Sequence, residues 1–326
     1  MILKRLICIP VLFLSAFAAN AQHSLADSLI HIDYLASIVE WMSSDSLKGR
    51  FTGTAYADRT ARFIADEFAK AGVSPVAGNE GYFMKVFNSL GNVIGVLPGK
   101  SKKDELVIFC AHYDHVGTKS SPVYKRQATS ADTIYNGAND NASGISGIIA
   151  LAKYFAELRN NERTLMFIAF TGEEMGLRGS SQLVPLLDPD KIIAVLNFDM
   201  IGRPINKKSG PFITGDVHSN LREILNKTLA AKDLKRYGTD YFSGDRYIYE
   251  KLFMRSDNYP FVAKGIPAHT IMTSSPNDRY YHSVDDEYKT IDFEKMVKLV
   301  RAVAVASSPI ISGEKTPSRI RLPLNY

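Results

Sequence analysis

Residues 164–176 read "TLMFIAFTGEEMG", an apolar run of seven residues that ends in a Thr-Gly turn and two adjacent glutamates. A short, almost continuous apolar run predicts a strand that is covered on both faces of its sheet. Glu173 and Glu174 follow the carboxyl end of this strand, where open α/β sheets carry their binding and catalytic side chains. Because adjacent carboxylates repel each other, the stretch predicts both a buried strand and a charged site at its end.

The same pattern recurs along the chain and indicates the fold class. Similar apolar runs are "NVIGVLPG" from Asn92, "ELVIFC" from Glu105, "KIIAVLNF" from Lys191 and "PAHTIM" from Pro267. Between these runs, segments such as 61–68, 144–158 and 293–300 are apolar on one helical face or almost all round. Strands that alternate with helices predict an α/β protein: a single-domain three-layer sandwich with a mostly parallel mixed central sheet flanked by helices.

The N-terminus reads "MILKRLICIPVLFLSAFAANAQ" and has the three parts of a signal peptide. Two basic residues precede a short apolar run, and Ala-Asn-Ala forms a cleavage site. The run is shorter than the about 20 residues that span a bilayer. We therefore expect residues 1–21 to be a signal peptide, with export to the periplasm or the medium and no stable membrane insertion after cleavage. Residues 22–312 are then expected to form the single folded domain, and 313–326 a C-terminal surface tail.

Charge and cysteine content exclude some classes of protein. Loss of Lys4 and Arg5 with the signal peptide lowers the formal charge from +5 to +3, and the sequence has no basic block. Nucleic acid is therefore not an expected partner. Cys8 also leaves with the signal peptide, so the remaining Cys110 can form no intrachain disulfide. Its place at the end of "ELVIFC" predicts a small buried apolar side chain.

Polar residues follow the other apolar runs as well. The run "ELVIFC" leads into His112, "KIIAVLNF" leads into Asp199, the turn "NGANDNASG" carries Asp140, and "RYYHSVDDE" carries His282. Each residue alone has an ordinary structural explanation, such as a turn or a helix cap. Together, imidazoles and carboxylates at strand ends are the ligands of a zinc-type site, in which Co²⁺ or Mn²⁺ can substitute.

Six motifs in one order resemble those of the co-catalytic zinc aminopeptidases of peptidase family M28. They are "AHYDHVG", "NGANDNASG", "TGEEMGLRGS", "NFDMIG", "RSDNYPFVAKGIPA" and "YYHSVDDE", preceded by "LKGRFTGT". The resemblance runs from about Leu47 to about Ala306. It implies an exopeptidase that uses two Zn²⁺ ions and acts on peptides with a free N-terminus.

The resemblance also implies roles for individual metal ligands. His112 and Asp199 match the ligands of one zinc ion, and Glu174 and His282 match those of the other. Asp140 matches the carboxylate that bridges both ions, and in the family the peptide bond that follows this residue is typically cis.

Further residues match the catalytic groups of the family. Glu173 matches the general base, Tyr281 a hydroxyl that stabilises the oxyanion, and Arg255 an arginine that holds the substrate terminus. Asp114 and Asp286 follow a liganding histidine by two and four residues, and each is expected to lie behind the ligands, where it orients an imidazole.

Three histidines have no role in the family motifs, and two alternative functions remain open. His115, His218 and His269 match no ligand and are expected to be structural or surface residues, with His115 nearest to the site. One alternative is a glutaminyl cyclase-like acyltransferase with a single zinc ion. A second is a catalytically inactive relative that binds peptides. The sequence predicts neither the oligomeric state nor the side-chain preference.

Overall fold

The structure is a computed structural model that describes residues 25–77, 81–123, 132–204, 206, 209–274 and 277–324. The predicted signal peptide, residues 1–21, lies outside the described residues, so export stays a prediction. Within the part of the chain that the structure describes, no helix has the length and apolar character needed to cross a bilayer.

The strands form one mixed sheet in the order β1-β3-β5-β4-β6-β9-β7-β8, with β2 paired to β3. Their bounds are β1 (Ser74–Pro75), β2 (Phe83–Val86), β3 (Ser89–Leu97), β4 (Lys102–His112), β5 (Arg163–Phe170), β6 (Ile192–Phe198), β7 (Phe212–Ile213), β8 (Ser243–Gly244) and β9 (Ala268–Met272). The predicted apolar runs are β3, β4, β5, β6 and β9. The central strands β5, β4, β6 and β9 are parallel, whereas β1, β2, β3 and β7 make antiparallel pairs, so the expected parallel character holds for the centre of the sheet.

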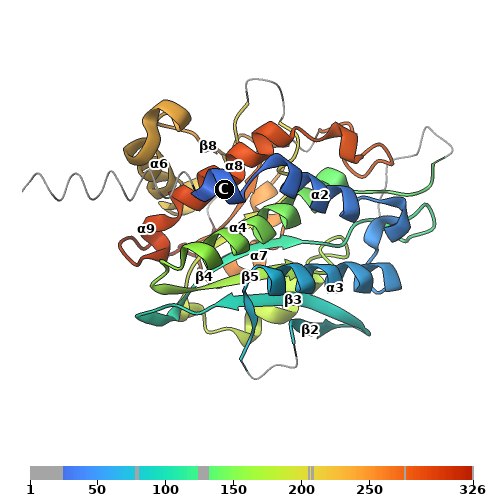
Figure 1. The fold of residues 1–326 in the computed structure, drawn as a ribbon, viewed down its shortest axis with the longest axis horizontal. Coiled ribbons are helices and arrows are strands. Elements are labelled where there is room, and N and C mark those ends of the chain that lie inside the picture. The colour runs from blue at the N-terminus through green and yellow to red at the C-terminus, as the bar shows by residue number, and fades with distance from the viewer. Residues whose placement is uncertain are drawn as a thin grey trace, which may run out of the picture.

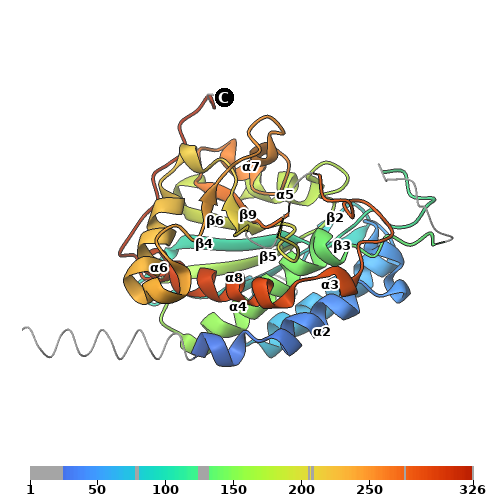
Figure 2. The same cartoon turned by 90° about the horizontal axis from the view of Figure 1, so that it is seen from above.

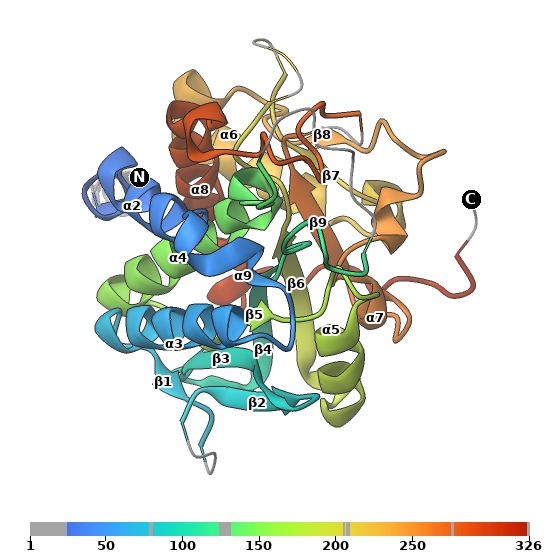
Figure 3. The same ribbon diagram turned by 90° about the vertical axis from the view of Figure 1, so that its right-hand side faces the viewer.

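Helices cover both faces of the sheet and make the predicted three layers (Figures 1, 2 and 3). Their bounds are α2 (Ile32–Met42), α3 (Ala55–Lys70), α4 (Gly144–Leu158), α5 (Arg178–Leu183), α6 (Leu221–Tyr237), α7 (Tyr259–Val262), α8 (Phe293–Ala306) and α9 (Ser308–Ile311). Figure 3 shows α2, α3, α4 and α8 on one side of the sheet and α5 and α7 on the other.

The two faces of the sheet have separate apolar cores. The larger core joins one face to α2, α3, α4, α6 and α8, and the smaller core joins the other face to α5 and α7. Cys110 belongs to the smaller core, is fully buried and donates its Sγ–H to Asn197 Oδ1 at 3.4 Å, as its apolar setting in the sequence predicts.

Helix α4 lies deepest against the sheet, and every residue from 144 to 152 is buried. Gly144 opens this helix. A Cβ atom there would lie 2.5 Å from the carbonyl oxygen of Phe198, the last residue of β6. Glycine therefore lets the start of α4 approach the end of β6, which brings the turn before the helix close to that strand end.

Residues 313–324 follow the last helix along the surface. Most of their side chains are exposed, but Ile320 is only 4% exposed and belongs to the smaller core. Its backbone N–H donates to the Gly265 carbonyl at 3.0 Å. This part of the predicted tail is therefore attached to the domain by both packing and a backbone hydrogen bond.

Substitution of Phe109 tests how much the larger core contributes to stability. Its ring is fully buried and lies 5.4 Å from the Phe155 ring and 5.6 Å from the Phe167 ring. We expect Phe109→Ala to lower the free energy of unfolding by about 3–5 kcal/mol, because it leaves a cavity in the layer between β4 and α4. Leu186→Ala, at a side chain that is 73% exposed, should change it by less than about 0.5 kcal/mol. Equal shifts in urea denaturation would contradict this assignment of the core.

Candidate metal centre

The parallel strands bring the predicted residues to one edge of the sheet. His112 is the last residue of β4 and is in register with Phe170, the last residue of β5. Glu173 and Glu174 follow β5 after a two-residue turn, and Asp199 directly follows β6. Because parallel strands end on the same side, these side chains meet there.

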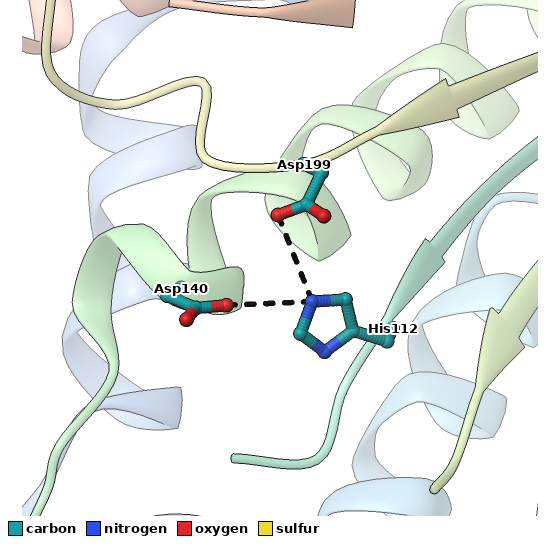
Figure 4. A group of neighbouring side chains, drawn as sticks. All are labelled: His112, Asp140 and Asp199. Atoms are coloured by element: carbon teal, nitrogen blue, oxygen red, sulfur yellow. Dashed lines mark ion pairs between the residues drawn. The ribbon is translucent and has the colours of Figure 1, made fainter. Parts of the chain in front are cut away.

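The first pocket consists of His112, Asp140 and Asp199 (Figure 4). The His112 Nε2 atom lies 3.4 Å from Asp140 Oδ1 and 3.7 Å from Asp199 Oδ1. All three residues are buried. Burial alone lowers the pKa of His112, but the charge of Glu173 and the contacts with Asp140 and Asp199 outweigh it and raise the pKa well above its usual value.

The second pocket uses the other oxygen of Asp140. His282 Nε2 lies 3.3 Å from Asp140 Oδ2 and 3.0 Å from Glu174 Oε2. Burial lowers the pKa of His282, but its contacts with Asp140 and Glu174 raise it to about 11. Asp140 therefore faces one imidazole with each oxygen, the arrangement that a bridging carboxylate requires. The peptide bond between Asp140 and Asn141 is cis, as expected.

These residues fit a metal ion by chemistry as well as by distance. Ligand atoms of His112, Asp140 and Asp199 lie within 4.8 Å of one another, and so do those of His115, Asp140 and Glu174. Imidazole nitrogen and carboxylate oxygen suit zinc. A cation would also offset the repulsion among carboxylates that are buried together.

Glu173 lines the same cavity, which has a volume of about 60 Å³, enough for several water-sized groups. The cavity is lined by His112, Asp140, Glu173, Glu174, Asp199, Met200, Leu252, Arg255, Ser256, Met272, Tyr281 and His282. Burial raises the pKa of the Glu173 carboxyl well above its usual range, and burial does the same to the Tyr281 hydroxyl. The Tyr281 ring stacks on the His282 ring at 3.9 Å, while Arg255 is an exposed residue of the cavity lining.

Asp114 contacts both the His112 ring and the loop that carries the two glutamates. Its Oδ1 lies 3.7 Å from His112 Nδ1, beside the imidazole that the sequence-based expectation assigned to it. The same carboxylate accepts the backbone N–H groups of Glu173 at 3.2 Å and Glu174 at 3.3 Å, and the Thr52 hydroxyl at 2.9 Å. Asp114 thus also holds the loop that carries both glutamates.

Asp286 differs from the expectation that it orients an imidazole. Its carboxylate accepts the backbone N–H groups of Asn139 and Asp140, each at 3.0 Å, and pairs with Arg203 at 2.6 Å. Asp286 therefore holds the backbone at Asn139 and Asp140. Spacing from His282 could not reveal this, because the partner segment lies almost 150 residues earlier in the chain.

Of the three histidines that match no ligand, two lie outside the site and one lies inside it. His269 is structural, as expected: it is buried, its Nδ1 lies 2.8 Å from the Thr214 carbonyl, and burial lowers its pKa to about 4. His218 is half-buried and stacks on Phe253. His115 lies inside the site, with Nδ1 3.1 Å from Glu174 Oε1. Sequence reasoning gave it no role there, although its position three residues after His112 was a signal.

Arg50 is a second residue whose place the sequence did not reveal. Its guanidinium is fully buried and donates to four backbone carbonyls, those of Tyr113 (2.9 Å), Met42 (2.6 Å), Asn136 (2.5 Å) and Gly137 (3.0 Å). Burial lowers its pKa to about 10. One side chain therefore joins the end of α2, the loop after His112 and the turn before Asp140.

Fold and site together define a class: an α/β protein whose parallel strands end at a candidate metal centre. The chain belongs to peptidase family M28, whose model matches residues 92–307. This confirms the family that the motifs indicated.

Individual proteins are similar to this chain in sequence or in fold. The aminopeptidase YwaD of Bacillus subtilis is 29% identical over 239 residues, which are 71% of this chain and 47% of that protein. The chain thus spans about half the length of the curated relatives it matches. The crystal structure of the LapA aminopeptidase of Legionella pneumophila superposes with a TM-score of 0.70 at 20% identity, covering 90% of this chain and 75% of that one. The glutaminyl cyclase of Porphyromonas gingivalis superposes with a TM-score of 0.65 at 17% identity, covering 86% and 99%. These two structures share the fold.

Arg50 gives a test of how the site loops are held. We expect Arg50→Met to lower the free energy of unfolding by about 3 kcal/mol or more, because buried carbonyls lose their donors. Arg50→Lys keeps a charge but lacks the planar fork, so it should recover only part of the loss. Arg321→Met, at an exposed site, is the matched control and should shift stability by less than about 0.5 kcal/mol. If the two methionine variants unfold at the same urea concentration, Arg50 does not hold these segments.

Proposed function

We propose that this protein is an exported zinc-dependent aminopeptidase that binds two metal ions and removes N-terminal residues from peptides. The observation that carries the proposal is Asp140, which presents one oxygen to His112 and the other to His282. Family membership and aminopeptidase relatives support the reaction class. Export rests on the signal-like sequence of residues 1–21.

The two pockets support an assignment of the metal ligands. His112 and Asp199 would hold one ion, Glu174 and His282 the other, and Asp140 both. Bound zinc would supply Lewis acidity that polarises a peptide carbonyl and activates water for attack.

Side chains of the protein would transfer the proton of the attacking water and stabilise the negative charge that develops on the substrate. Glu173 lines the cavity beside the ligands, where a carboxylate can take a proton from water and return it to the leaving amine. The Tyr281 hydroxyl keeps its proton at neutral pH and would donate a hydrogen bond to the developing oxyanion. Arg255, at the exposed rim, would help to hold a substrate terminus. The surrounding carboxylates would attract the positively charged amino group of a peptide, which favours cleavage at the N-terminus.

The reaction is tested with aminoacyl-p-nitroanilides and short peptides, each in free and N-acetylated form. We expect zinc-replete protein to hydrolyse only the free amines, to lose activity with a chelator and to regain it when zinc is added back. Protein that is inert on all these substrates would contradict the proposal. Ring closure of N-terminal glutaminyl peptides without peptide hydrolysis would instead support the cyclase alternative.

The adjacent glutamates provide a matched pair of variants. Glu173→Gln should lower turnover by about 10²–10⁴-fold, because the proton carrier is lost, while the metal content measured by mass spectrometry stays near that of the wild type. Glu174→Gln should chiefly weaken metal binding, because it removes a charged ligand. Loss of metal from the Glu173→Gln variant, or full metal content in the Glu174→Gln variant at limiting zinc, would contradict these two roles.

A further inference from the structure

His115 carries an inference that goes beyond the roles assigned above and rests on the proposed two-metal site. The ring is fully buried, and its Nδ1 lies 3.1 Å from Glu174 Oε1, closer than the 3.8 Å to Asp140 Oδ2. The other oxygen of the same glutamate, Oε2, lies 3.0 Å from His282 Nε2. The two oxygens of Glu174 therefore have different partners.

We propose that His115 is a positioning residue that makes Glu174 a one-oxygen metal ligand. An ionised carboxylate only accepts hydrogen bonds, so the proton lies on His115 Nδ1 and is donated to Oε1. Oε2 then remains as the oxygen that faces the second pocket with Asp140 Oδ2 and His282 Nε2.

The surroundings of the ring support this arrangement. A Cβ atom at Gly137 would lie 2.6 Å from two carbons of the His115 ring, so the ring packs directly on the glycine backbone. The ring also meets His282 edge-on, with centroids 5.7 Å apart. The His115 Nε2 atom is buried and has no hydrogen-bond partner among the residues that the structure describes. With the proton on Nδ1, this nitrogen has no N–H that requires an acceptor.

The function of such a contact is to fix the direction of a ligand. A carboxylate that is free to rotate can offer either oxygen or both to an ion, whereas a hydrogen bond to Oε1 selects Oε2. Outer-shell partners of this kind typically change metal affinity by about 10–100-fold when removed. His115 would therefore tune the second pocket alone and leave the pocket of His112 and Asp199 unaffected.

Stepwise titration of the metal-free protein with Co²⁺, followed by visible absorption, tests this independently of catalysis. We expect His115→Ala to weaken the second ion by about 10–100-fold and to leave the first unchanged. His115→Asn keeps an N–H donor near the position of Nδ1 but is a poor zinc ligand. It should therefore bind both ions almost as the wild type does.

A histidine far from the site provides the matched control for the titration. His31→Asn lies at the helix cap of α2, where asparagine also serves, and should match the wild type. Two unchanged affinities in His115→Ala would overturn the proposal, and so would a loss in His115→Asn as large as that in His115→Ala, because the imidazole itself would then be required. A wild type that binds a single Co²⁺ ion would overturn the two-metal function as well, so the two failures are told apart.

A spectroscopic measurement on the wild type gives a second test that does not rely on metal affinities. In protein with ¹⁵N-labelled histidines and bound ¹¹³Cd²⁺, we expect metal–nitrogen coupling to the imidazoles of His112 and His282 only. The His115 ring should show a protonated Nδ1. Coupling to a third imidazole, assigned to His115 from its loss in His115→Asn, would make His115 a ligand and overturn the proposal.

Discussion

Mutual repulsion among buried carboxylates is the constraint on which this structure depends. Two like charges about 4 Å apart at an effective dielectric constant of about 20 repel by about 4 kcal/mol, and Asp140, Glu174 and Asp199 share one cavity with Glu173. The pKa values of neighbouring carboxyl groups shift in opposite directions in response. Contacts hold the pKa of Asp140 well below its usual range, whereas burial raises that of Glu173 well above it. One carboxylate is thus kept charged, whereas a second carboxyl in the same cavity holds a proton more readily than it would in water.

The backbone around the site is held by groups that never face the cavity. Asp286 accepts hydrogen bonds from the N–H groups of Asn139 and Asp140, and Arg50 donates to four carbonyls from three segments. Gly144 lets the first turn of α4 approach the end of β6. These contacts fix the separation between His112 and Asp140 through the chain itself, so the pockets do not depend on a metal ion alone for their shape.

Much of the fold and the site could be predicted from the sequence, because both follow local patterns. Continuous apolar runs identified the central strands. The polar residues after three of these runs indicated His112, Glu174 and Asp199, whereas Asp140 and His282 were indicated by their own motifs. What the sequence did not reveal depends on contacts between distant segments. Nothing near Asp286 indicates that its partners are the N–H groups at 139 and 140, and nothing in "LKGRFTGT" indicates that Arg50 is buried. The short strands β7 and β8 were missed because two residues carry no periodicity.

The site is built from segments that lie far apart in the sequence and are therefore synthesised at different times. One pocket needs residues from 112 to 199, whereas the other also needs His282, which follows the last strand of the sheet. The first pocket also depends on a late residue, because Asp286 holds the backbone at Asp140. Metal binding at either pocket would therefore follow synthesis of the chain through residue 286, which separates formation of the strands from the acquisition of metal.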